Sequence, residues 1–184
     1  MSPQFSPSTL ANIETLKRRY PDGQSKSALL PILHMAQGEL GGHLSREVMD
    51  YVASILNIQP IEVYEVATFY TMFHLQPTGK YILEVCRTGP CSLVGAEKII
   101  EYLKQKLGVE LNQITPDGLF TIKEVECLAS CGSAPMLQVG ECYVEHLTEA
   151  KVDEMLAALK AGSLSGHEPN PKHSILFRTR GETA

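Results

Sequence analysis

The residues best suited to chemistry in this sequence are its cysteines. Cys86 and Cys91 form a C-x4-C pair, Cys127 and Cys131 form a C-x3-C pair, and Cys142 stands outside the pattern. An odd number of cysteines without a secretion signal argues against a disulfide framework. Two close pairs indicate a metal site held by thiolates, whereas Cys142 is expected to face the core as a small apolar side chain.

The spacing of the cysteines limits which kinds of metal or redox centre they could form. Four thiolates suit either tetrahedral zinc or an iron–sulfur cluster. A thioredoxin-type dithiol requires C-x-x-C and a Rieske centre requires two histidines beside its cysteines, and neither pattern is present. Structural zinc usually staples small modules with little other core, so an iron–sulfur cluster is favoured here and a zinc-stapled interaction module is the alternative.

The two cysteine pairs are expected to meet because each pair follows a strand. Alternating apolar residues predict a strand over 80–86 and another over 119–126, with a helix beginning near Ser92 between them. A helical crossover leaves two such strands parallel, so their carboxyl ends point the same way. Both cysteine loops then emerge at one edge of the sheet, and the helix near Ser92 adds its positive end there.

The segment after these strands continues the same domain. Two further strands are predicted over 136–139 and 142–146, separated by Gly140-Glu141, a glycine-first pair typical of a type II′ hairpin turn. Thr148 is expected to cap a last helix that Gly162 ends. The predicted order is therefore β-α-β-β-β-α.

The remainder of the chain divides around this domain. Residues 1–76 have apolar residues at helical spacing in successive segments, which predicts an N-terminal helical bundle. Residues 80–161 form the predicted α+β domain, and 162–184 are polar and read as an extended C-terminal tail that docks locally or on a partner.

Composition excludes several classes of function. The 184 residues carry a net charge of −5 and a pI near 5.7, without the basic stripe that nucleic acid binding needs. The longest nearly apolar stretch, 28–35, is far too short to span a membrane, and the first 20 residues lack a signal-peptide core. We therefore expect neither nucleic acid binding nor membrane insertion, and a reducing, cytoplasmic setting.

Several motifs make the sequence resemble a known family, the 24 kDa subunit of respiratory complex I (NADH:quinone oxidoreductase), whose domain is a thioredoxin-like [2Fe-2S] ferredoxin. The resemblance covers about residues 10–160. The motifs that carry it are VYEVATFYTMF at 63–73, VC at 85–86, PC at 90–91, TPDGLFT at 115–121, ECLASC at 126–131 and AP at 134–135.

The resemblance implies a thioredoxin-like fold with a four-stranded mixed sheet and one [2Fe-2S] cluster. Carried over by position, it assigns Cys86, Cys91, Cys127 and Cys131 as cluster ligands and gives this chain no catalytic residue. It also implies a partner subunit that holds FMN and the NADH site, in a complex peripheral to the cytoplasmic side of the inner membrane. Since relatives of this kind also serve NAD-linked hydrogenases and formate dehydrogenases as diaphorase-type subunits, those assemblies are the alternative.

Overall fold

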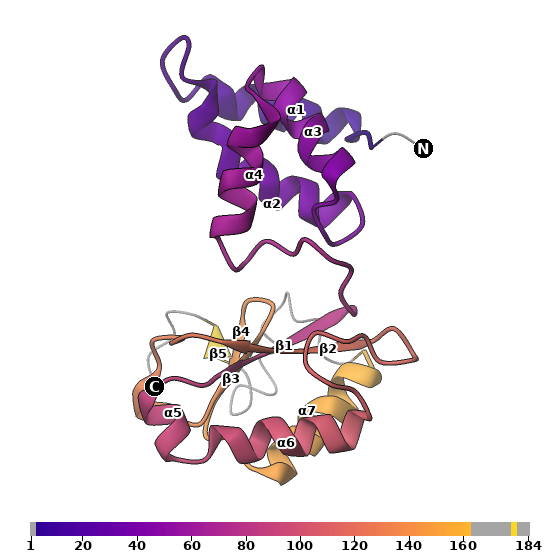
Figure 1. The fold of residues 1–184 in the computed structure, drawn as a ribbon, viewed down its shortest axis with the longest axis vertical. Coiled ribbons are helices and arrows are strands. Elements are labelled where there is room, and N and C mark those ends of the chain that lie inside the picture. The colour runs from indigo at the N-terminus through magenta and orange to yellow at the C-terminus, as the bar shows by residue number, and fades with distance from the viewer. Residues whose placement is uncertain (1–2, 163–177, 180–184) are drawn as a thin grey trace. The chain divides into compact units, whose positions relative to one another are not determined.

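The structure is a computed structural model that describes residues 3–162 and 178–179. The chain divides into two compact units, residues 1–77 and 78–184 (Figure 1). The first unit is helical and the second contains the sheet. The assignment of domains to 1–76, 80–161 and 162–184 stays a prediction.

The N-terminal unit consists of helices packed around an aliphatic core, as predicted. Ser6 and Ser45 cap two of the helices by accepting hydrogen bonds from Thr9 and Val48 backbone N–H groups. Its core is completely shielded from solvent at Ile32, Leu33 and Val52. The described elements are α1 (Pro7–Lys17), the 3-10 helix η1 (Ser25–Ala28), α2 (Leu29–Glu39), α3 (Arg46–Leu56) and α4 (Pro60–Phe69).

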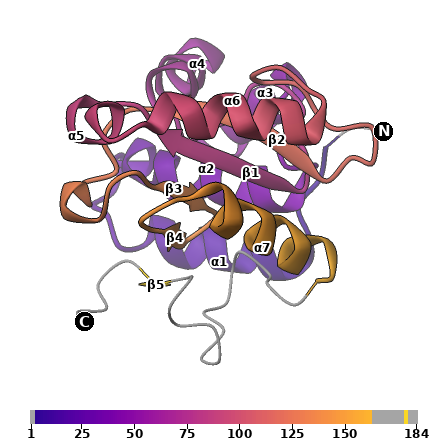
Figure 2. The same ribbon diagram turned by 90° about the horizontal axis from the view of Figure 1, so that it is seen from below.

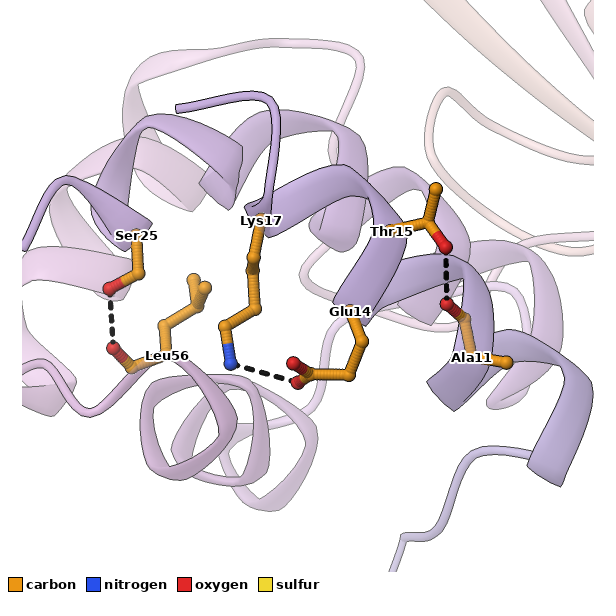
Figure 3. A network of polar contacts seen from close by, with 6 residues as sticks. All are labelled: Ala11, Glu14, Thr15, Lys17, Ser25 and Leu56. Carbon is orange, nitrogen blue, oxygen red and sulfur yellow. Dashed lines mark hydrogen bonds and ion pairs between the residues drawn. The ribbon is translucent and has the colours of Figure 1, made fainter. Parts of the chain in front are cut away.

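Polar contacts join η1 to α3 and also lie within α1 (Figure 3). The Ser25 hydroxyl of η1 donates to the carbonyl of Leu56, the last residue of α3, at 2.9 Å. The last carbonyls of a helix lack intrahelical partners, so this bond satisfies one of them. Within α1, Lys17 pairs with Glu14 at 2.8 Å and the Thr15 hydroxyl donates to the Ala11 carbonyl at 3.0 Å.

The second unit is built on a mixed sheet with strand order β2-β1-β3-β4-β5. Its parallel pair is β1 (Tyr81–Cys86) and β2 (Phe120–Val125), whose register runs without interruption from Tyr81 opposite Phe120 to Cys86 opposite Val125. The two strands are therefore parallel neighbours, as the sequence predicts. On the other side of β1 lie β3 (Leu137–Val139) and β4 (Cys142–Val144), both in antiparallel pairings.

Helices α6 (Ala96–Leu107) and α7 (Glu149–Lys160) cover one face of this sheet (Figures 1 and 2). Leu83, Val85 and Ile122 are completely buried in the core cluster that includes the apolar residues of both helices. Among the described residues, no helix is long and apolar enough to cross a membrane.

The helix that follows the first cysteine pair differs from the prediction. It does not begin near Ser92, because residues 89–93 form the separate short helix α5 (Gly89–Leu93) and α6 begins after Gly95. Gly95 has φ +97°, a left-handed conformation that glycine adopts without strain, and this turn redirects the chain between the two helices. The prediction that a helix begins near Ser92 and points its positive end at the cysteine loops is thus wrong.

The four predicted strands lie in one mixed sheet, which confirms the predicted α+β, thioredoxin-like fold class. A short additional strand lies at the edge of this sheet. This strand, β5 (Arg178–Thr179), pairs antiparallel with β4. It belongs to the predicted tail 162–184, of which residues 163–177 and 180–184 lie outside the described residues. The described strand of the tail therefore docks on the chain's own sheet.

Gly79, at the entrance to β1, is a position where a side chain would not fit. A Cβ on Gly79 would lie 2.6 Å from the Phe120 backbone carbon, and the Gly79 N–H donates to the buried Thr121 hydroxyl at 2.8 Å. We expect Gly79→Ala to lower the free energy of unfolding by about 1–3 kcal/mol, since the backbone of β2 must move. Urea unfolding followed by far-ultraviolet circular dichroism measures the change.

The matched control is Gly38→Ala in α2. Gly38 is exposed and has open space around its Cα, so alanine there is expected to stabilise its helix by about 0.5–1 kcal/mol. Equal stabilities for the Gly79→Ala and unaltered chains would contradict the close approach to Phe120.

Candidate metal centre

Four cysteines converge at the carboxyl ends of the parallel strands. Cys86 is the last residue of β1, and Cys127 follows shortly after the end of β2. Cys91 lies in α5, and Cys131 begins the 3-10 helix η2 (Cys131–Ser133). Because β1 and β2 are adjacent and parallel, both loops leave the sheet at the same edge.

The four sulfurs form two close pairs that also influence each other. The Cys127 and Cys131 Sγ atoms are 3.7 Å apart. Cys86 and Cys91 are hydrogen-bond partners, and the Cys131 thiol interacts electrostatically with both. The structure thus brings together the four cysteines that the sequence singled out, as free thiols.

The two pairs differ in their exposure to water. Cys86 and Cys91 are each only 2% exposed and pack with Ala96, Met136 and Tyr143 in a small core cluster. Cys127 and Cys131 are exposed. One side of the centre is therefore sealed by side chains, and the other faces outward in this chain.

The thiols have different tendencies to ionise. Burial opposes ionisation of Cys86, but hydrogen bonds from the Thr88 hydroxyl and the Leu128 backbone N–H outweigh it and hold the Cys86 pKa below its usual value. Burial and the neighbouring Cys86 raise the pKa of Cys91 to about 11. The hydrogen bond with Cys127 is the main cause that raises the pKa of Cys131.

Backbone N–H groups surround the sulfurs. The N–H of Leu128 bonds to Cys86, that of Met136 bonds to Cys91, and that of Ala129 donates to Cys127 Sγ at 3.4 Å. Hydrogen bonds of this kind stabilise negative charge on sulfur. The donor set therefore fits a metal centre that binds four thiolates.

The arrangement in pairs also fits a centre with two metal ions. In a [2Fe-2S] cluster with all-cysteine ligation each iron takes two thiolates. Within the part of the chain that the structure describes, no three or more His, Cys, Asp or Glu side chains are grouped so as to hold a metal ion, and the sulfurs lie as two pairs.

Side chains from the end of β4 hold the second cysteine loop. The Tyr143 hydroxyl donates to the Leu128 carbonyl at 2.7 Å. Glu145 accepts hydrogen bonds from the Ser130 hydroxyl at 2.9 Å and the Ser133 hydroxyl at 2.6 Å. Residues 127–133 are thus tied to the sheet at several points, which restricts the positions of Cys127 and Cys131.

Sequence reasoning missed this role of Tyr143 and Glu145. The signal available was strand alternation: Cys142 and Val144 were expected to face the core, which leaves Tyr143 and Glu145 on the opposite side. Cys142 is indeed buried among the residues packed under α6 and α7, so that prediction is confirmed.

Two sets of opposite charges face each other along and just beyond β1 and β2. Arg87 forms an ion pair with Glu124 at 2.6 Å, which offsets their opposite effects on a bound anionic group. Glu84 and Lys123 are cross-strand neighbours. Burial raises the Glu84 pKa and lowers the Lys123 pKa, and the attraction between the two groups opposes both shifts.

The fold and the site together define a class: a thioredoxin-like domain that brings four cysteine side chains together at the carboxyl edge of its parallel strands, an arrangement that fits a metal centre. Comparison with known families agrees with this class. Residues 13–160 match the thioredoxin-like [2Fe-2S] ferredoxin family, so the chain belongs to that family. Membership implies one [2Fe-2S] cluster as its cofactor.

Individual relatives are similar over most of their length. An NADH-quinone oxidoreductase subunit of Rickettsia prowazekii is 41% identical over 152 residues, which are 83% of this chain and 86% of the relative. The mitochondrial NADH dehydrogenase [ubiquinone] flavoprotein 2 of Dictyostelium discoideum is 41% identical over 179 residues, 97% of this chain and 72% of the relative.

A solved structure shares the fold at lower identity. A chain of an NAD⁺-reducing [NiFe]-hydrogenase in the air-oxidised state matches 83% of this chain with a TM-score of 0.69 and 18% identity. This chain spans only 25% of that hydrogenase chain, so the likeness concerns the fold alone.

The anchoring of the second cysteine loop by Glu145 is open to test. Glu145→Ala removes the acceptor of two hydroxyl hydrogen bonds, and we expect it to lower the free energy of unfolding by about 1–3 kcal/mol. Glu145→Gln keeps an acceptor oxygen and should lose less. Urea unfolding of the variants, prepared identically, measures the order.

The matched control is Glu141→Ala, which removes an exposed carboxylate from the hairpin turn and should change the stability by less than about 0.5 kcal/mol. If both alanine variants lost the same stability, the hydrogen bonds to Ser130 and Ser133 would not be what stabilises the loop.

Proposed function

We propose that this chain is the [2Fe-2S] electron-transfer subunit of an NADH:quinone oxidoreductase. The observation that carries the proposal is the 41% identity to an NADH-quinone oxidoreductase subunit of one bacterium and to a mitochondrial flavoprotein 2, over most of this chain in both cases. Family membership and the convergent cysteines support the same conclusion.

Cys86, Cys91, Cys127 and Cys131 are the proposed cluster ligands. When bound, a [2Fe-2S] cluster supplies a site that accepts and releases one electron at a time. The pairing of the sulfurs supports one pair for each iron, with Cys86 and Cys91 on the buried side and Cys127 and Cys131 on the exposed side. The chain's own residues bind and orient the thiolates and shield half of the centre from water.

The proposed partner is a flavoprotein subunit that carries FMN and the NADH site, with which this chain exchanges single electrons. Flavin bridges hydride chemistry and one-electron chemistry, so a one-electron site beside it is useful. The sequence lacks a G-x-G-x-x-G motif and a P-loop for binding a dinucleotide, which supports a role without catalytic residues. We place the chain in a complex peripheral to the cytoplasmic side of the inner membrane, without direct membrane insertion.

Metal analysis tests the cofactor. Purified under anaerobic conditions, the chain should be brown, contain two irons and two acid-labile sulfides, and give a paramagnetic resonance signal on one-electron reduction. A colourless protein with one zinc ion would support the stapled interaction module instead.

Serine variants test the ligands. Cys86→Ser and Cys127→Ser each remove one thiolate from a different pair, and we expect each to lose most of the cluster, measured as iron per chain. Cys142→Ala is the matched control, since Cys142 lies in the core under the helices, and should keep the full iron content. Loss of iron in Cys142→Ala alone would overturn the ligand assignment.

Isolation of the native complex tests the partner. The chain alone should not oxidise NADH, whereas affinity purification from its source cells should recover an FMN-containing, NADH-oxidising protein with quinone-reductase subunits. Recovery of a nickel hydrogenase or a formate dehydrogenase would instead assign the chain to a diaphorase-type role.

A further inference from the structure

One peptide group links a tyrosine of the sheet to a cysteine of the metal centre. The carbonyl of the Leu128–Ala129 peptide accepts a hydrogen bond from the Tyr143 hydroxyl at 2.7 Å. The N–H of the same peptide group donates to Cys127 Sγ at 3.4 Å. A peptide group is planar, so fixing the direction of its carbonyl also fixes the direction of its N–H.

The peptide group needs such an anchor because of where it lies. Ala129 is exposed and has φ +61°, a left-handed conformation that alanine seldom adopts. Cys127 is also exposed, so packing around its side chain does little to hold the loop. A conformation of this kind persists only when other contacts impose it.

The position of Tyr143 allows it to impose this left-handed conformation on Ala129. Its side chain is only 9% exposed and packs with Cys86, Cys91 and Met136, on the sealed side of the centre. Its flanking residues in β4, Cys142 and Val144, are buried in the core under the helices, which fixes the strand. The hydroxyl is thus a rigid donor that reaches from the sheet to the loop.

We propose that Tyr143 is a positioning residue that holds the Ala129 N–H on the Cys127 sulfur and thereby raises the reduction potential of the cluster. The inference rests on the proposed role of Cys127 as a ligand. Reduction adds one negative charge to the centre, and a hydrogen bond to a ligand sulfur becomes stronger as the sulfur becomes more negative, so it favours the reduced state. The N–H of Leu128, which belongs to the preceding peptide group, bonds to Cys86 and favours the reduced state independently of Tyr143.

The test is the variant Tyr143→Phe in the full chain with its cluster. This change removes the hydroxyl and keeps the ring that packs on the sealed side. We expect the reduction potential, from a redox titration followed by paramagnetic resonance, to become more negative, by up to a tenfold change in the one-electron equilibrium constant, or about 59 mV.

Tyr102→Phe is the matched control. The Tyr102 hydroxyl donates to Asp153 at 2.8 Å, a contact between α6 and α7 that does not involve the cysteine loops. The control should leave the potential unchanged. A negative shift of the same size in both variants would show a general effect of losing a hydroxyl and would contradict the positioning role.

A second readout reports on the hydrogen bond itself. Iron–sulfur stretching bands in the resonance Raman spectrum should shift on exchange into D₂O where an N–H donates to a ligand sulfur. We expect this deuterium shift to be smaller in Tyr143→Phe than in the unaltered chain and the Tyr102→Phe control. An identical deuterium shift together with an identical potential in Tyr143→Phe would overturn the inference.

A further variant tests the inference if Tyr143→Phe does not retain the cluster. Incorporating, at position 143, a tyrosine fluorinated beside its hydroxyl keeps the shape of the ring and makes the hydroxyl a stronger donor. Because hydrogen bonds in a chain polarise one another, the Ala129 N–H then becomes a stronger donor to Cys127. The potential should then become more positive, and an unchanged or more negative potential would contradict the inference. Failure of the unaltered chain to bind any [2Fe-2S] cluster would instead contradict the proposed function.

Discussion

The parallel pairing of β1 with β2 is the constraint on which the rest of the site depends. The uninterrupted register sets Cys86 opposite Val125, so the chain leaves both strands at the same level. The two cysteine loops, which a long helix and a strand separate in the sequence, are thereby brought to one edge of the sheet. The pairing is secured by Leu83, Val85 and Ile122, which are completely buried in the core shared with the helices. The hydrophobic core therefore determines the separation of the two cysteine pairs, although none of the four proposed ligands belongs to that core cluster.

Sequence reasoning succeeded where the signal was local and periodic. The strands, the crossover and the convergence of Cys86 with Cys127 follow from alternation and from the geometry of parallel connections. It failed where the structure depends on distant contacts. Strand β5 is two residues long and exists by pairing with β4, so Arg178–Thr179 carry no pattern of their own. The polar pair Lys123-Glu124 interrupts the alternation of apolar residues along β2, yet the register is continuous and Lys123 pairs with Glu84 across it.

The error at Ser92 has a similar origin. A serine before an apolar stripe is an ordinary start for a helix, but Gly89 and Pro90 occupy the first positions of a separate short helix that holds Cys91. Gly95, with its left-handed φ, then breaks the path before α6. The break allows Cys91 to lie beside Cys86 while the longer helix packs on the sheet. The serine at position 92 is therefore not a helix start, because it lies inside the short helix that places Cys91 beside Cys86.

The hairpin between β3 and β4 links this architecture to the chemistry of the centre. Gly140 has φ +58° and the next residue returns to ordinary backbone, which matches the predicted type II′ turn and fixes which residues of β4 face which side. Cys142 and Val144 fill the core beneath the sheet, and Tyr143 consequently points to the cysteine loop. A register slip of one residue would exchange the two faces, burying the tyrosine hydroxyl among aliphatic side chains and leaving the Leu128 carbonyl without its donor. The alternation of side chains along β4 therefore has two effects: it buries Cys142 and Val144 in the core, and it directs Tyr143 to the second cysteine loop. A change in the packing of this strand would consequently also change the metal centre.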